Sequence, residues 1–86
     1  IQFWADIDMG GFRMFDNLQT LIPSVLPMRM SGELVDKFHE HGLVRSKSYL
    51  SELESDLKNG KYDLFEGAIE QILYYGVTIE QEAFLN

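Results

Sequence analysis

The chain has 86 residues, 45% of them hydrophobic and 13% aromatic, which is enough for one small globular domain. It contains no cysteine, which excludes disulfide bonds, thiolate zinc sites and thiol nucleophiles, and we expect a cytoplasmic protein. Fourteen acidic residues against seven basic ones give a net charge of −7, which argues against a domain that binds DNA on its own, because lysine and arginine drive duplex binding. A catalytic module that offsets its carboxylates with a divalent cation is still compatible with this charge.

Two further features concern targeting and completeness. No apolar run approaches the length of a membrane span, and no signal-peptide pattern is present, so we expect no membrane association. The sequence starts without methionine and is strand-like within a residue or two, so we expect a fragment of a longer protein.

An apolar strand at the start of the chain leads into two aspartates one residue apart, Asp6 and Asp8. Alternate side chains of a strand point to the same face, so both carboxylates are expected to project from the strand end, where α/β sheets bind ligands. Two adjacent carboxylates repel each other unless a cation or a shared proton lies between them, and Mg²⁺ commonly takes one or two carboxylates. The pair therefore predicts a metal site. The alternative is that the aspartates cap the turn at Gly10 and Gly11.

The rest of the chain predicts helices separated by short connections. Apolar residues recur at helical spacing from Phe12 to Ile22, where Pro23 ends the helix. Residues 25–30 read as a short second strand. Three more helices are expected over residues 31–42, 46–60 and 63–76, the last opened by a capping box at residues 63–66. This order predicts an α/β fold with a short parallel sheet flanked by helices.

A second acidic pair, Glu80 and Glu82, follows the last predicted helix. If residues 77–82 are extended, both carboxylates point the same way and can complete a cluster with the two aspartates. If residues 78–81 form a capping box, a helix begins there and only one glutamate can reach a metal. A solvated acidic surface is the alternative interpretation of this pair.

The remaining polar residues give weaker signals. His39 and His41 are two apart on a predicted helix and cannot bind one metal together, so they are expected at the surface of the helix end. Tyr74 and Tyr75 are expected to pack in the core with their hydroxyls in water, although either is a nucleophile in principle. The arginines are too scattered to predict a phosphate clamp: Arg13, Arg29 and Arg45.

The two ends of the chain together resemble the Toprim-like domain of the Wadjet JetD family, which is related to the A subunit of topoisomerase VI. FWADIDMGGF at residues 3–12 is similar to the family's aromatic-Gly-Asp-hydrophobic-Asp…Gly-Phe segment, and VTIEQE at residues 77–82 is similar to its Leu-Glu-Gln-Glu motif. Residues 26–34 resemble the family's hydrophobic strand that runs into a helix start. Residues 1–86 would then be a single Toprim-like domain fragment, the C-terminal portion of that domain.

This resemblance implies a Mg²⁺-dependent DNA nuclease, with Mn²⁺ as an alternative metal, in an SMC-like bacterial complex that restricts plasmids. By position, Asp6 and Asp8 would be metal ligands, Glu80 a third ligand or a base, and Glu82 a further acidic site residue. DNA and the subunits of the complex would be its partners, and a homodimer is left open. In this family a metal ion would stabilise charge on the scissile phosphate and position or activate water.

Three positions depart from the family pattern. Ala5 replaces the glycine before the first aspartate, and Ser31 lies about where an acidic residue is expected. The Toprim glutamate comes from an upstream strand that these residues lack, so we expect the fragment alone to be inactive or very weak.

Two other functions stay open. A phosphotransferase or phosphatase with an aspartyl nucleophile also carries two aspartates after a strand, but residues 9–11 lack the hydroxyl that usually follows the second one. A non-catalytic interaction module would instead use the acidic surface to dock a basic partner.

Overall fold

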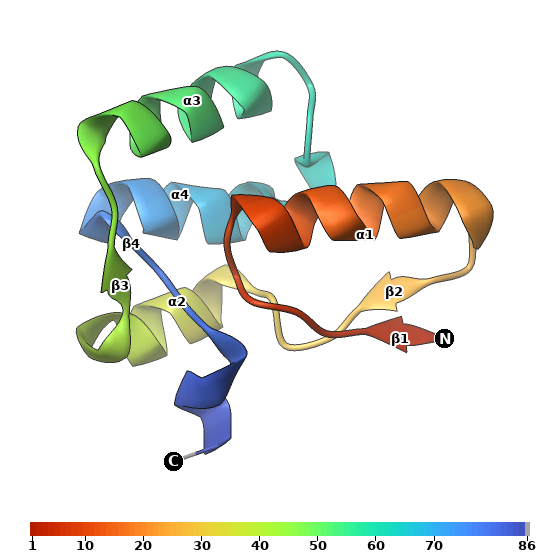
Figure 1. The fold of residues 1–86 in the computed structure, drawn as a ribbon, viewed down its shortest axis with the longest axis horizontal. Coiled ribbons are helices and arrows are strands. Elements are labelled where there is room, and N and C mark those ends of the chain that lie inside the picture. The colour runs from red at the N-terminus through yellow and green to blue at the C-terminus, as the bar shows by residue number, and fades with distance from the viewer. Residues whose placement is uncertain (86) are drawn as a thin grey trace.

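Helices make up most of the described part of the chain, and within it four two-residue strands complete the fold (Figure 1). The computed structural model describes residues 1–85. The strands and α-helices follow one another as β1 (Gln2–Phe3), α1 (Met9–Leu21), β2 (Leu26–Pro27), α2 (Gly32–Phe38), β3 (Leu43–Val44), α3 (Lys47–Lys58), α4 (Glu66–Tyr75) and β4 (Val77–Thr78). Three 3-10 turns lie between or after them: η1 (His39–His41), η2 (Asp63–Phe65) and η3 (Gln81–Leu85).

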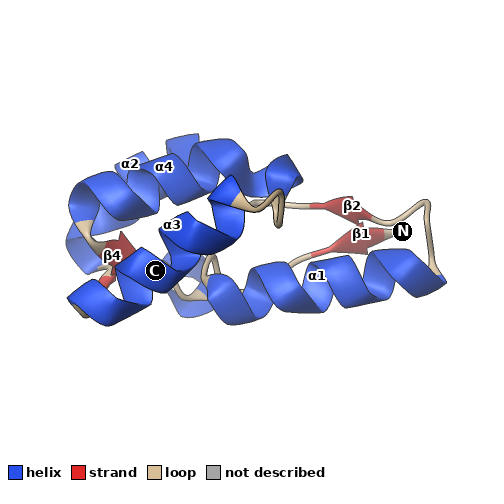
Figure 2. Ribbon diagram, turned by 90° about the horizontal axis from the view of Figure 1, so that it is seen from above, coloured by secondary structure: helices blue, strands red, loops and turns tan. Residues whose placement is uncertain are grey.

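The strands form two separate pairs at opposite ends of the molecule (Figures 1 and 2). β1 pairs with β2 in parallel, as the strand–helix–strand order predicts. β3 pairs with β4 antiparallel, so the expected short parallel sheet accounts for the first pair and not for the second. The sequence gives no signal for β3, because two residues between Gly42 and Arg45 are too few to show an alternating pattern.

The N-terminal and C-terminal segments meet at an isolated antiparallel bridge between Ile7 and Ile79. The amide of Ile7 donates to the carbonyl of Ile79 at 2.7 Å, and the amide of Ile79 donates to the carbonyl of Ile7 at 3.2 Å. Both isoleucine side chains are fully buried. The bridge therefore anchors the two ends of the chain to each other inside the core.

Local capping signals explain the start of α1, the start of α3 and the end of α4. The carboxylate of Asp8 accepts from the amide of Gly11 and caps α1, and the hydroxyl of Ser46 accepts from the amide of Tyr49 and caps α3. Gly76 ends α4 with a φ of 72°, a left-handed conformation that glycine adopts without strain.

The expected capping box at residues 63–66 is wrong. Neither η2 nor α4 begins with a hydrogen bond from a capping side chain. The chain instead turns at Tyr62, whose φ is 59°, and passes through η2 before α4 begins. The approach to this helix is set by a buried tyrosine and not by side-chain capping.

The core lies around α4, which packs against α2 and α3 (Figure 1). Its largest side chains are aromatic: Phe12 stacks on Phe65 with ring centres 4.7 Å apart, and Phe15 meets Phe65 edge-on at 5.2 Å. Tyr74 lies on the other side of α4 and is 79% exposed, so the expectation that it packs in the core is wrong. Within residues 1–85, no helix has the length and apolar character needed to cross a membrane.

Candidate functional site

Asp6 and Asp8 lie on either side of the buried Ile7, immediately before α1. Both line one pocket of about 350 Å³ together with Trp4 and Gln81. In an antiparallel bridge the residue before one partner lies across from the residue after the other. The bridge at Ile7 therefore places the backbone of Asp6 across from residue 80, and that of Asp8 across from residue 78. We call this region, residues 6–8 with residues 78–81, the junction.

Asp6 is tied to the C-terminal segment. Its Oδ1 accepts from the backbone amide of Gln81 at 2.7 Å, although the two residues are 75 positions apart. The side-chain amide of Gln81 in turn donates to the carbonyl of Trp4 at 3.0 Å. These two bonds fasten η3 to the first segment of the chain and hold the Asp6 carboxylate in place.

Asp8 is held from two directions. Its Oδ1 accepts from the amide of Gly11 at 2.7 Å, and its Oδ2 lies 3.8 Å from Nη2 of Arg45. The side chains of this ion pair are partly buried, 18% exposed for Asp8 and 25% for Arg45. The expected alternative, an aspartate that caps the glycine turn, therefore applies to Asp8. Capping leaves lone pairs on both oxygens, so it does not exclude metal binding.

Arg45 and Tyr49 frame Asp8 on the side of α3. Nε of Arg45 donates to the hydroxyl of the fully buried Thr78 at 2.8 Å, and its guanidinium lies 4.7 Å from the ring centre of Tyr49. The Tyr49 hydroxyl accepts from the amide of Met9 at 2.8 Å. Burial, the largest effect, raises the pKa of the Tyr49 phenol, and the hydrogen bond from the Met9 amide partly offsets it. The charge of Asp8 raises this pKa by less, and Arg45 and Arg13 lower it by less again. Tyr49 is therefore a neutral structural phenol at neutral pH.

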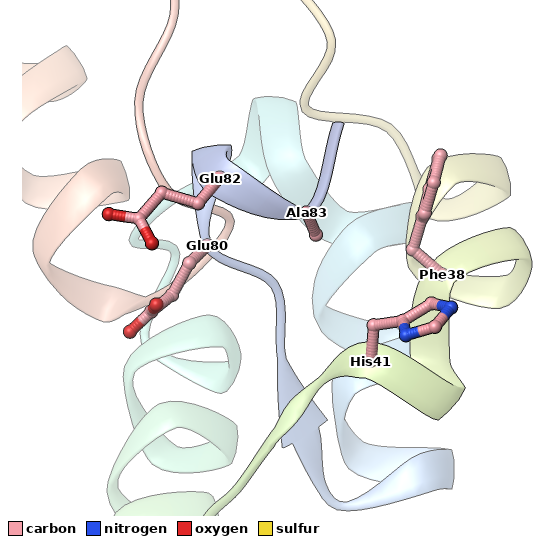
Figure 3. A pocket seen from close by; sticks show the side chains of 5 residues that line it. All are labelled: Phe38, His41, Glu80, Glu82 and Ala83. Carbon is pink, nitrogen blue, oxygen red and sulfur yellow. The ribbon is translucent and has the colours of Figure 1, made fainter. Parts of the chain in front are cut away.

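Glu80 and Glu82 line a second pocket, of about 290 Å³, with Phe38 and His41. The backbone is extended through Ile79 and turns into η3 at Gln81, so the extended alternative holds up to the bridge. The capping box at residues 78–81 is wrong, because Thr78 lies in β4 and the amide of Gln81 donates to Asp6 instead. Figure 3 shows both glutamate side chains extending to the same side of their segment, away from Phe38 and His41.

The four acidic residues thus divide between two pockets. Asp6 and Asp8 share one, and Glu80 and Glu82 share the other. Within residues 1–85, no three histidine or acidic side chains are grouped closely enough to hold a metal ion. Two hard carboxylates in one pocket fit the needs of Mg²⁺, which retains several waters. The roles of all four residues stay predictions.

The histidine and tyrosine residues singled out in the sequence lie away from the pocket of Asp6 and Asp8, and His41 lines the pocket of the two glutamates. His39 stacks on Tyr75 with ring centres 4.0 Å apart, and the Tyr75 hydroxyl donates to Asp36. That hydrogen bond raises the pKa of Tyr75. His41 is exposed at the end of η1, as expected.

Sequence reasoning missed Arg45, Tyr49 and Thr78. Tyr49 looks like an ordinary member of the apolar face of α3, and Arg45 like an isolated surface charge. Their place beside Asp8 follows from the β3–β4 pairing, where the amide of Arg45 donates to the carbonyl of Gly76 at 2.9 Å. Nothing in the sequence predicts that pairing.

The bridge joins the same two segments whose residues resemble one family, residues 3–12 and 77–82. No curated protein and no solved structure matches this chain. The family described as "Wadjet protein JetD, C-terminal" matches residues 1–85, and the chain therefore belongs to that family.

Proposed function

We propose that this domain is the C-terminal part of a Toprim-like, Mg²⁺-dependent DNA nuclease domain that works within a Wadjet complex. The observation that carries the proposal is the bridge between Ile7 and Ile79, which brings the segment of the two aspartates beside the segment of the two glutamates. Membership of the JetD family supports the same assignment.

In this proposal Asp6 and Asp8 bind the metal, which Mn²⁺ can replace. Both carboxylates are fixed by backbone amides, so their oxygens are held in place before a metal arrives. Glu80 serves as a base and not as the third ligand that the resemblance also allows, because no three acidic or histidine side chains of residues 1–85 are grouped closely enough to hold one ion. Glu82 is a further acidic site residue. When bound, the metal would supply stabilisation of charge on the scissile phosphate and activation of water.

DNA must be held largely by other parts of the protein or by its Wadjet partners. The net charge of −7 repels a duplex, and the described arginines nearest the pocket already have partners: Arg45 contacts Asp8, and Arg29 lies over the ring of Trp4 at 5.1 Å. We therefore expect the domain to cleave DNA only when basic surfaces in the complex, or in a homodimer, deliver it. We also expect the protein to be cytoplasmic.

The test is plasmid cleavage by the full-length protein with its Wadjet partners. D6N and D8N should each lower the Mg²⁺-dependent rate by about a hundredfold or more, because a metal ligand supplies several kcal/mol of transition-state stabilisation. Asn is nearly isosteric with Asp and caps helices well, so the fold should survive. D63N, at an exposed aspartate of η2, is the matched control and should cleave like the wild type. Wild-type cleavage by D6N and D8N would refute the proposal.

An acidic interaction module is the second candidate, and a groove between α2 and α4 favours it. We call this feature the α2–α4 groove; its volume is about 780 Å³, and Glu33, Asp36 and Glu70 line it. A basic partner would dock there by charge complementarity. Loss of plasmid restriction in E33Q/E70Q, with D6N and D8N fully active, would establish this function instead.

A further inference from the structure

Arg45 is held in position by contacts that do not involve Asp8. Its amide donates to Gly76, its Nε donates to Thr78, and its guanidinium lies over the ring of Tyr49. Thr78 is fully buried, and removal of its partner would leave a buried hydroxyl without that donor. The positive charge is therefore fixed beside Asp8 whatever Asp8 binds.

Asp8 is likewise held without Arg45. The amide of Gly11 fixes Oδ1 at 2.7 Å, as expected of a helix cap. The distance of 3.8 Å between Oδ2 and Nη2 of Arg45 is too long for a direct hydrogen bond. The two groups therefore interact through charge, and neither positions the other.

Arg45 also lies outside the space that a metal would enter. The described residues that line the pocket of Asp6 and Asp8 come from the first segment, the start of α1 and Gln81. Asp8 thus has a fixed cation on one side and the pocket on the other. A divalent ion bound from the pocket would face the guanidinium across a single carboxylate.

From this geometry, and resting on the proposed function, we propose that Arg45 is a built-in counter-cation of Asp8 that weakens metal binding at this carboxylate. A guanidinium cannot lose its proton at any physiological pH, and this one cannot move away without breaking its bonds to the core. Each bound metal ion must therefore tolerate a nearby positive charge. A site weakened in this way fills mainly when an anionic phosphodiester lies beside it, because the phosphate attracts both cations.

The experiment measures Mn²⁺ binding to the full-length protein by electron paramagnetic resonance of free Mn²⁺, without DNA. R45Q should bind Mn²⁺ about three- to tenfold more tightly at low ionic strength, and the difference should shrink as salt is added, because it is a charge effect. R45K keeps the charge and should stay within about twofold of the wild type. K58Q, at an exposed lysine in the last turn of α3, removes the same charge elsewhere and should change nothing.

Two further variants keep the outcomes distinct. R45M keeps a long unbranched apolar side chain at this position and replaces R45Q if that variant does not fold. D8N tests the site itself: Mn²⁺ binding unchanged by D8N would refute the proposed metal ligand and with it the proposed function. Binding lost in D8N but unchanged or weaker in R45Q and R45M would overturn the inference on Arg45 alone.

Discussion

Two acidic regions of the described residues, the junction and the α2–α4 groove, are built differently. At the junction, Asp6 and Asp8 each accept a bond from a backbone amide and are partly buried. In the α2–α4 groove, Glu33, Asp36 and Glu70 are all exposed. Asp36 accepts a hydrogen bond from the Tyr75 hydroxyl, which comes from a side chain and not from the backbone. Acidity is common to both, so it does not identify the site. The fixed orientation of the junction carboxylates distinguishes the junction from the groove, because a binding site needs groups that are held in place before the ligand arrives.

The largest expected contrast concerns stability. Ile79 is fully buried in the bridge, so I79A should lower the free energy of unfolding by about 2–5 kcal/mol through lost burial and the cavity left behind. E33Q/E70Q changes only exposed groups of the groove and should stay within about 0.5 kcal/mol. Native-state hydrogen exchange of α1 and α4 amides in the full-length protein measures both values. Equal protection in the two variants would mean that the junction is not a structural anchor.

Gly10 and Gly11 offer a sharper test beside the junction, because both lie in the first turn of α1 and not in the separate turn that the sequence suggests. A Cβ at Gly11 would lie 2.1 Å from the carbonyl oxygen of Asp6, whereas one at Gly10 would meet nothing closer than 3.5 Å. G11A must therefore displace backbone, and we expect a loss of about 1–3 kcal/mol or more. G10A is the matched control and should be neutral or slightly stabilising, because alanine is the better helix former. The same hydrogen exchange measurement applies, and equal effects would disprove the close approach at Gly11.

A third prediction separates the two roles of Asp8. D8A removes the cap of α1 and should cost about 1 kcal/mol of stability, whereas D8N keeps a capping oxygen and should cost much less. Both should lose Mn²⁺ binding, because neither supplies a carboxylate. D36N in the groove should leave Mn²⁺ binding unchanged. Denaturation and Mn²⁺ titration of the three variants decide the matter, and retained binding in D8N would exclude Asp8 as a ligand.

The sequence was informative where the signal is local. The cap at Ser46, the stop at Gly76 and the cap at Asp8 all follow from residues within one turn of the helix end. The expected box at residues 63–66 failed because the chain enters α4 through Tyr62 and a 3-10 turn, which capping rules do not anticipate. The prediction that Tyr74 packs in the core was wrong because α4 buries the face that carries Ile72, and Tyr74 lies on the other side of the helix.

The site could be predicted only in part, for the same reason. The residue pattern marks Asp6 and Asp8 as a pair, because alternate residues of a strand share one face. The structure keeps the pair but not the strand: β1 ends at Phe3, and the two aspartates flank the bridge residue Ile7. Their partners come from distant positions: Gln81 reaches Asp6, and Arg45 reaches Asp8 only because β3 pairs with β4. Contacts of this kind depend on the tertiary fold, so no local pattern reveals them.

The smallest expected effect concerns Tyr49, which supports the junction from α3. Its pKa is raised mainly by burial, so the folded protein favours the neutral phenol. Above the ordinary tyrosine pKa the unfolded chain loses this proton first, and stability should therefore fall as the pH rises toward the folded value. Y49F removes the contribution of Tyr49 to this dependence, and it leaves the amide of Met9 without its partner at a cost of about 1 kcal/mol. Absorbance titration of wild type and Y49F identifies the delayed phenol. If the phenol that is missing in Y49F titrates at the ordinary tyrosine pKa in the wild type, Tyr49 is not buried against the junction as the structure has it.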